Sequence, residues 1–98
     1  MKLTWQITQR KSGRPFDMAT EVDHYLLEMQ VEGAPGFTAI PGPGATATEF
    51  NLDVTDPGTY NFRLTCYPKT GAASDPATAS AQILDQTAPV IATFTATV

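Results

Sequence analysis

The sequence contains few of the residues on which most catalytic and metal chemistry depends. Cys66 is its only cysteine and His24 its only histidine. One cysteine allows no disulfide within the chain and no thiolate zinc cluster. A Cys–His pair or a serine triad would have to use His24, but the alternation of side chains places Cys66 on an inward face and His24 on an outward one. Because no Gly-x-Ser-x-Gly turn is present either, we predict a protein that is not an enzyme.

Charge and long apolar runs are also scarce. Charged residues make up 16% of the chain, and 10 acidic against 6 basic residues give a formal net charge of −4. This balance opposes binding to nucleic acid and to anionic lipid. No continuous apolar stretch near the beginning suits a signal peptide or a membrane span. We therefore expect neither nucleic acid nor a membrane as a partner, and a protein that stays in the compartment where it is made.

Two loop features have only part of the composition of a ligand site. Residues 42–44 are rich in glycine but lack the Lys and Ser or Thr of a phosphate-binding loop, and proline removes an amide that a phosphate would need. Glu49, Asp53 and Asp56 are acidic, but their spacing fits no EF-hand loop. We expect no cofactor and no metal.

Alternation of apolar and polar residues is the dominant pattern, and no helical periodicity is present. It predicts strands over residues 2–8, 22–31, 48–54, 60–67 and 77–83. Turn-rich stretches separate them, and one of these, residues 34–47, reads as a connection or a weak edge strand. The length of 98 residues and the apolar fraction of 42% suit one small core. We predict an all-β antiparallel sandwich with a core of inward-facing residues, namely Leu3, Trp5, Ile7, Tyr25, Leu27, Met29, Phe50, Leu52, Tyr60, Phe62, Leu64 and Cys66.

Three motifs, in order, resemble a fibronectin type III domain, one of the immunoglobulin-like folds. They are Leu3-Thr4-Trp5, Tyr25-Leu26-Leu27-Glu28-Met29, and Asp56-Pro57-Gly58-Thr59-Tyr60-Asn61-Phe62-Arg63-Leu64. Residues 71–76 then match the loop before the last strand of that family. The resemblance covers residues 2–84 and implies that Trp5 lies in the second strand of the family and that Tyr25 opens the third.

Two departures from the family pattern carry information. The Pro-Gly turn is one residue closer to Tyr60 than in relatives, which leaves open whether this tyrosine forms the hydrogen-bonded corner of the family. The first strand of the family would precede Leu3, so we expect that strand to be missing at the N-terminus.

Residues 85–98 continue past the expected last strand. Val90, Ala92, Phe94, Ala96 and Val98 fall on one face, which would be apolar. The other face has Thr93, Thr95 and Thr97, with Ile91 as the only break in the pattern. We predict a sandwich over residues 1–84 and a C-terminal extension over residues 85–98 that forms an extra strand. It could pair in cis, at the open edge beside residues 2–8, or in trans with a neighbouring copy or another protein.

Two other groups are candidate contacts with partner proteins. Arg10, Lys11 and Arg14 form a basic loop that could bind a carboxylate or phosphate on a partner, or could simply be a soluble loop. Phe37 and Ile40 lie in the Pro/Gly-rich connection, where they would either form an interface or fold over the end of the core.

Small, disulfide-free immunoglobulin-like or fibronectin-like proteins without a signal peptide resemble accessory proteins of bacteriophage virions. The resemblance implies a structural virion component, either a head decoration protein or a tail accessory protein, assembled in the host cytoplasm. Its partners would be virion proteins or copies of itself, bound in many copies. The alternatives are a carbohydrate- or receptor-binding module, with Phe37 and Tyr67 as its aromatic contacts, and an accessory domain of a bacterial enzyme.

Overall fold

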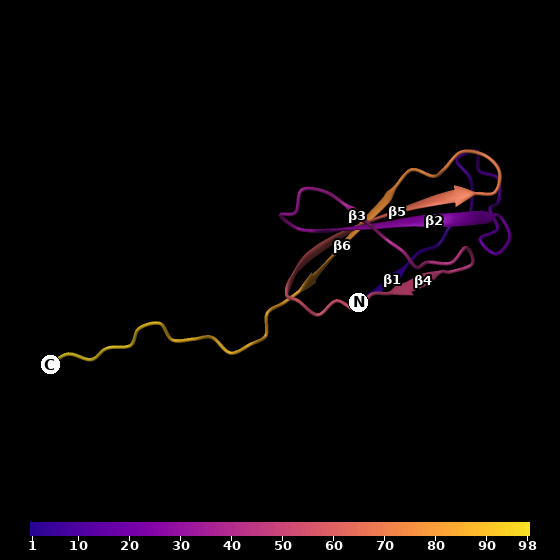
Figure 1. Ribbon diagram of the computed structural model, residues 1–98. Helices are drawn as coiled ribbons and strands as arrows, with labels where there is room; N and C mark the ends of the chain where they lie inside the picture. The colour runs from indigo at the N-terminus through magenta and orange to yellow at the C-terminus, as the bar shows by residue number, and fades with distance from the viewer.

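The computed structural model describes residues 1–98, which form strands and no helix. No helix is therefore available that could cross a membrane. Six strands make two antiparallel sheets that pack as a β-sandwich (Figure 1). The two-stranded sheet pairs β1 (Lys2–Thr4) with β4 (Glu49–Asn51). The four-stranded sheet has the order β3 (Thr38–Ile40), β2 (Val22–Val31), β5 (Gly58–Pro68) and β6 (Ala77–Ile83).

The long antiparallel pair of β2 and β5 forms the centre of the larger sheet. Tyr25 lies opposite Cys66 and Leu27 lies opposite Leu64 in this pair. These residues come from the inward positions of the alternating pattern, so one face of the pair is apolar. A register shift between Val22 and His24 marks a bulge at the start of β2.

The core is small and lies between the two sheets. Its buried apolar members are Phe16, Val22, Tyr25, Leu27, Tyr60, Phe62 and Cys66. The other residues predicted for the core are half-buried, namely Leu3, Trp5, Ile7, Met29, Phe50, Leu52 and Leu64. Trp5 meets Tyr25 edge-on, with the ring centroids 5.4 Å apart. The smaller sheet therefore covers the core only partly.

The predicted strands over residues 2–8 and 48–54 are too long. Pairing between them ends after three residues on each side, apart from the hydrogen bonds that Trp5 and Leu52 make just beyond the strands. After Trp5 the chain leaves β4 and makes its hydrogen bonds with the loop over residues 9–21. There the Ile7 amide donates to the Met18 sulfur, and the Thr8 carbonyl accepts from the Phe16 amide. The first of these bonds uses the Ile7 amide, which a longer ladder with β4 would need.

Tyr60 forms a hydrogen-bonded corner despite the shortened turn. Its hydroxyl donates to the Asp56 carbonyl oxygen at 2.7 Å. The tyrosine ring is buried, so this bond satisfies its one polar atom and ties the turn before β5 to the core.

The C-terminal extension forms no strand within this chain. Residues 84–98 run away from the sandwich as an extended segment, drawn in yellow in Figure 1. The extension therefore makes no strand pairing in cis, and its pairing in trans stays a prediction. The molecule measures 78 × 24 × 23 Å along its principal axes, and this segment lengthens it well beyond the sandwich.

Candidate protein-binding surface

The sandwich is open along one side, between β1 and β6. Each of these strands is the last in its sheet, and no strand bridges them. A groove of ≈150 Å³ lies between them, which we call the open seam. It is lined by Leu3, Thr4, Trp5, Leu27, Phe62, Leu64, Ala77, Thr78 and Ala79. The seam therefore leads from solvent to the apolar interior at Leu27 and Phe62.

The main chain of β1 is unpaired on the side that faces away from β4. Met1 and Leu52 exchange two hydrogen bonds, and the Trp5 amide donates to the Thr48 carbonyl. Hydrogen-bonded and non-bonded pairs alternate in an antiparallel ladder, so the main-chain groups of Lys2 and Thr4 point the other way. This edge has the unsatisfied donors and acceptors that an added strand would use.

The C-terminal extension presents apolar side chains to solvent. Phe94 is 92% exposed and Val90 91% exposed. Between residues 86 and 98 the chain has no Lys, Arg, Asp or Glu. Full burial of each of these two side chains would contribute about 1.5–3 kcal/mol. The extension therefore has the composition of a segment that is buried against a partner, and not that of a solvated tail.

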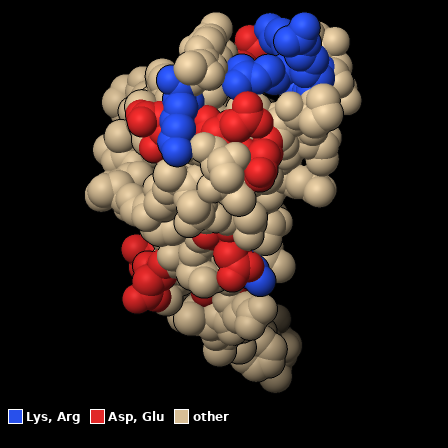
Figure 2. Space-filling model, turned by 90° about the vertical axis from the view of Figure 1, so that its right-hand side faces the viewer, with Lys and Arg blue, Asp and Glu red and all other residues tan.

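The basic loop lies at the end of the sandwich opposite the extension, where Figure 2 shows Lys and Arg side chains gathered at one corner. The Arg10 guanidinium lies over the Phe16 ring at 5.1 Å from its centroid and contacts Glu21 at 3.4 Å. The Lys11 ammonium pairs with Asp75 at 2.9 Å. Arg14 is exposed and makes no ion pair. Of the three basic residues, Arg14 alone has its charge free for a partner.

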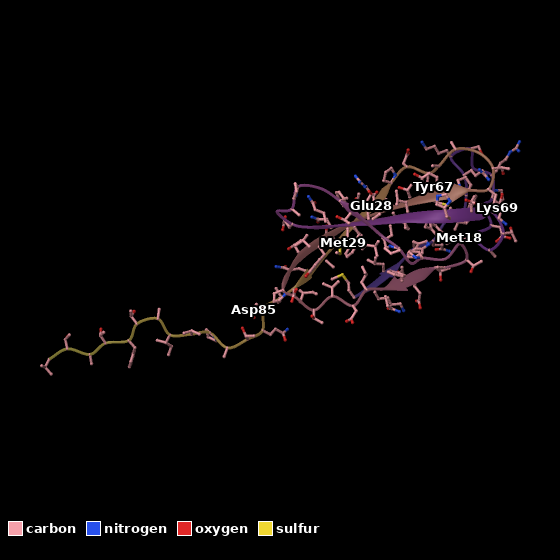
Figure 3. The ribbon with its side chains drawn as sticks, viewed as in Figure 1. Met18, Glu28, Met29, Tyr67, Lys69 and Asp85 are labelled. Carbon is pink, nitrogen blue, oxygen red and sulfur yellow. The ribbon has the colours of Figure 1, made fainter.

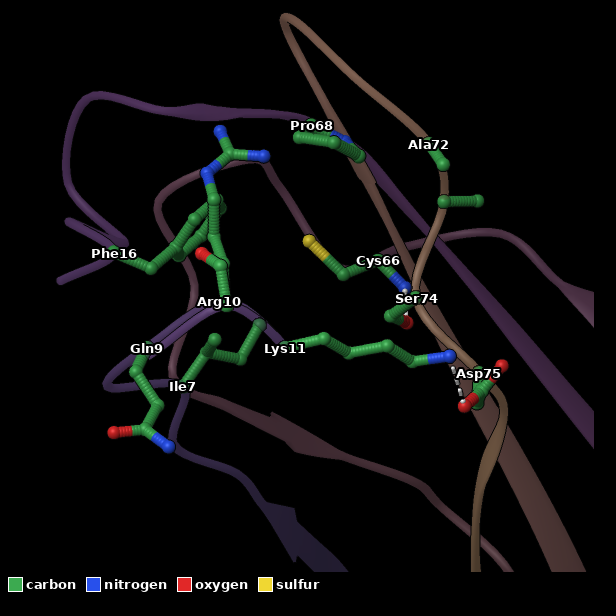
Figure 4. Close-up of a pocket in the computed structure, with 12 residues that line it drawn as sticks. Ile7, Gln9, Arg10, Lys11, Phe16, Cys66, Pro68, Ala72, Ser74 and Asp75 are labelled. Carbon is green, nitrogen blue, oxygen red and sulfur yellow. Dashed lines mark hydrogen bonds and ion pairs between the residues drawn. The ribbon is translucent and has the colours of Figure 1, made fainter. Parts of the chain in front are cut away.

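A second cavity, of ≈390 Å³, separates the basic loop from residues 68–76 (Figure 4). Cys66 points into it from β5, and its main-chain amide donates to the Ser74 hydroxyl at 2.9 Å. Burial raises the pKa of the Cys66 thiol, and the charge of Arg10 only partly opposes this effect. A buried thiol that stays neutral suits packing better than nucleophilic chemistry.

His24 and Cys66 are not brought together. The His24 ring is on the outer face of the four-stranded sheet, where it stacks on Tyr67 with the centroids 4.5 Å apart. Cys66 lies opposite Tyr25 on the inner face. The sheet itself separates the imidazole from the thiol.

The acidic residues in and after β4 form no metal-ligating cluster. Glu49 pairs with Lys2 across β1 and β4 at 2.9 Å. No group of three or more His, Cys, Asp or Glu side chains lies close enough together to hold a metal ion.

Phe37 and Ile40 do not form an exposed apolar surface. Phe37 is half-buried on the outer face of the large sheet, where the Arg63 guanidinium lies 4.2 Å from its ring centroid. Ile40 is half-buried in β3, opposite Leu27. Each side chain thus has a partner within the chain, and a role of this pair in an interface stays a prediction.

A polar network covers the outer face of the large sheet, around Glu28 of β2, which is labelled in Figure 3. Arg63 donates to both carboxylate oxygens of Glu28, at 2.9 and 2.8 Å. Beside this pair, Asn61 donates to Gln30 and accepts from Ser80. The network joins β2, β5 and β6 on the side away from the core.

The Glu28–Arg63 pair should make stability depend on pH. The hydrogen bonds from Arg63, opposed by some desolvation, lower the pKa of Glu28 in the folded protein. Its contribution is therefore complete above the pKa of an unfolded-state glutamate, about 4.3, and is lost as the pH falls through the lower folded value. We expect Glu28→Gln to reduce the free energy of unfolding at pH 7 and to flatten its decline between pH 5 and pH 3.

Urea unfolding at several pH values measures this effect. Glu32→Gln is the matched control, because Glu32 is exposed and makes no ion pair. Parallel acid profiles for wild type and Glu28→Gln would contradict the assignment.

The sequence indicates the extension and an open edge beside residues 2–8, but not the groove between this edge and β6. The signal for the seam was the small inward side chains of residues 77–83, which leave space beside Trp5. No family model, curated protein or solved structure matches the chain. The candidate surface is therefore identified from the structure of this chain alone.

Proposed function

We propose that the protein is a non-catalytic structural protein that attaches in many copies to a larger assembly. Its proposed place is in a bacteriophage virion, as a head decoration protein or a tail accessory protein. The observation that carries the proposal is the extension, whose apolar side chains are almost fully exposed at Val90 and Phe94. A segment of this kind gains stability only when another surface covers it.

The order of the strands supports a fibronectin type III-like fold. If β1, which precedes Trp5, is the second strand of the family, β4 is the fifth, and immunoglobulin-like sandwiches place these two strands side by side. On the same assignment, β2, β5 and β6 correspond to the third strand and the last two strands, which share the other sheet. The Tyr60 corner agrees with this assignment. Folds of this type commonly serve as structural and binding modules, although the fold alone does not fix the role.

The carbohydrate-binding alternative has less support. It needs exposed aromatic rings, and the candidates were Phe37 and Tyr67. Both are half-buried, Phe37 under Arg63 and Tyr67 against His24. No observation favours an accessory domain of an enzyme over a structural protein.

Deletion of residues 86–98 should abolish incorporation into the assembly while leaving the sandwich folded. All six strands end before this segment, so the deletion removes no strand pairing. The measurement is sedimentation of the protein with particles from phage-producing cells that carry either the full-length or the shortened gene. Circular dichroism of the purified proteins checks the fold.

A charge scan of the same segment provides the matched control. Val90→Asp with Phe94→Asp should block incorporation, whereas Thr93→Asp with Thr95→Asp adds the same charge to the opposite face and should not. Normal incorporation of the shortened protein would contradict the proposed function.

A further inference from the structure

We propose that the extension of one copy completes the open seam of a second copy. In this arrangement residues 90–98 add a strand antiparallel to β1 and place their apolar face over the seam. The inference rests on the proposed function and names the partner of the extension, which is another copy of this chain.

The seam and the extension are chemically complementary. The seam offers an apolar floor at Leu27 and Phe62, beside the small side chains of Ala77 and Ala79. The extension offers one large side chain, Phe94, with alanine two residues away on each side. A large side chain between small ones fits a narrow groove that has small side chains along its β6 wall.

The main chain is complementary in the same way. β1 has free donors and acceptors at Lys2 and Thr4, on the side away from β4. The extension has no main-chain partner of its own from Val90 onwards. Pro89 cannot donate to a ladder, so it sets the point at which an added strand would begin.

The direction of the chain favours a second copy over self-pairing. Figure 1 shows that β1 begins, and β6 ends, at the same end of the sandwich, and that the extension leaves from this end. A segment folding back onto its own β1 would have to run parallel to it. In a second copy placed beyond this end in the same orientation, the extension enters from the opposite end and runs antiparallel to β1. Antiparallel pairing is the geometry of both sheets of this fold.

The lengths of the segments agree with this geometry. Residues 90–98 span roughly 30 Å as a strand, and residues 85–89 add a linker of about 17 Å. β1, by comparison, spans three residues, Lys2–Thr4. The linker thus separates the added strand from β6, and the strand is long enough to cover the whole free edge of β1.

Each copy would then be both donor and acceptor. The contact joins two different surfaces, so it is heterologous and repeats from copy to copy unless the arrangement closes into a ring. This repetition would bring many copies of the chain together through one type of contact.

A donor–acceptor experiment with full-length chains tests the inference. Val90→Asp with Phe94→Asp makes an acceptor-only chain, because a buried strand cannot accept two uncompensated charges. Thr4→Pro makes a donor-only chain, because it removes an amide from the free edge of β1 and none from the β4 ladder. Light scattering coupled to size-exclusion chromatography should show wild-type oligomers that grow with concentration and two variants that are each monomeric. An equimolar mixture of the variants should form a heterodimer.

The matched control is Thr93→Asp with Thr95→Asp, which should associate as wild type does. Self-association of the acceptor-only chain should be weaker than that of this control by about a hundredfold or more. If Thr4→Pro fails to fold, a labelled peptide of residues 85–98 replaces the donor chain and should bind the acceptor-only chain.

The inference fails if the acceptor-only chain still forms oligomers, or if neither the mixture nor the peptide shows binding. A wild-type chain that stays monomeric also overturns it. In that case, amides of residues 90–98 protected from hydrogen exchange would indicate pairing in cis. The proposed function does not depend on these results. It holds as long as deletion of residues 86–98 still blocks incorporation into the assembly.

Discussion

Leu27→Ala should lower the free energy of unfolding by about 2–5 kcal/mol. Leu27 is the most completely buried large side chain, with 2% of its surface exposed. It lies between Leu64 of β5 and Ile40 of β3 and forms part of the floor of the seam. The small core has few other side chains that could move to fill the space. Because domains of this size are stable by only about 5–15 kcal/mol, the loss is a large part of the total.

Urea or thermal unfolding followed by circular dichroism measures this loss. Leu84→Ala provides the matched control, because the same side chain is removed from a position that is 62% exposed just after β6. The change for Leu84 should stay within about 0.5 kcal/mol. Similar losses at the two positions would mean that Leu27 is not at the centre of the core.

Gly42→Ala should be the second most damaging substitution. Gly42 has a φ angle of 149°, a conformation that side chains rarely adopt and that costs about 1–3 kcal/mol. An added Cβ would also collide with the ring of Phe50. Phe50 lies in β4 opposite Leu3, so its displacement would disturb the two-stranded sheet as well. We expect Gly42→Ala to lower the free energy of unfolding by more than the cost of the backbone conformation alone.

Gly44→Ala is the control within the same Pro/Gly-rich segment. A Cβ at Gly44 meets no atom within 4 Å, and its φ angle lies outside the range that excludes side chains. Its effect on the free energy of unfolding should be small, and could be a gain of about 0.4–1 kcal/mol through the unfolded state. Equal effects of the two substitutions would contradict the close approach of Gly42 to Phe50.

The sequence predicts the long strands of the larger sheet well. Period-two alternation is a local signal, and it locates the ends of β2, β5 and β6 to within two residues. The alternation overestimates the lengths of β1 and β4. Each of these strands ends where its partner, distant in the sequence, turns away from it. Trp5 and Ile7 continue the alternating pattern, but their main-chain groups bond elsewhere.

Phe16 shows why an irregular segment can still contribute to the core. Residues 9–21 have no period, so nothing in the pattern marks this phenylalanine as buried. It is 9% exposed because Arg10 lies over its ring and the turn at residues 18–21 brings the chain back to β2. Such burial depends on the packing of several segments, which a one-dimensional pattern does not contain.

The candidate surface could be predicted only in part from the sequence, because the seam depends on how segments distant in the sequence pack together. The apolar face of the extension, from Val90 to Val98, can be read directly from its alternation. The seam requires the order of the strands, since it exists only because β1 and β6 are the open edges of two sheets. The free main-chain side of β1 likewise follows from the register with β4.

The short ladder between β1 and β4 also bears on how the chain folds. Thr4 pairs with Glu49, so forming this contact closes a loop of about 45 residues, whereas the first pair between β5 and β6, Leu64 with Ala77, closes one of about 13. Three residue pairs compensate poorly for the conformational entropy lost in the larger closure. We therefore expect β5 and β6 to form early, β1 to dock onto β4 last, and the N-terminal strand to be the first to fray when the folded protein is perturbed.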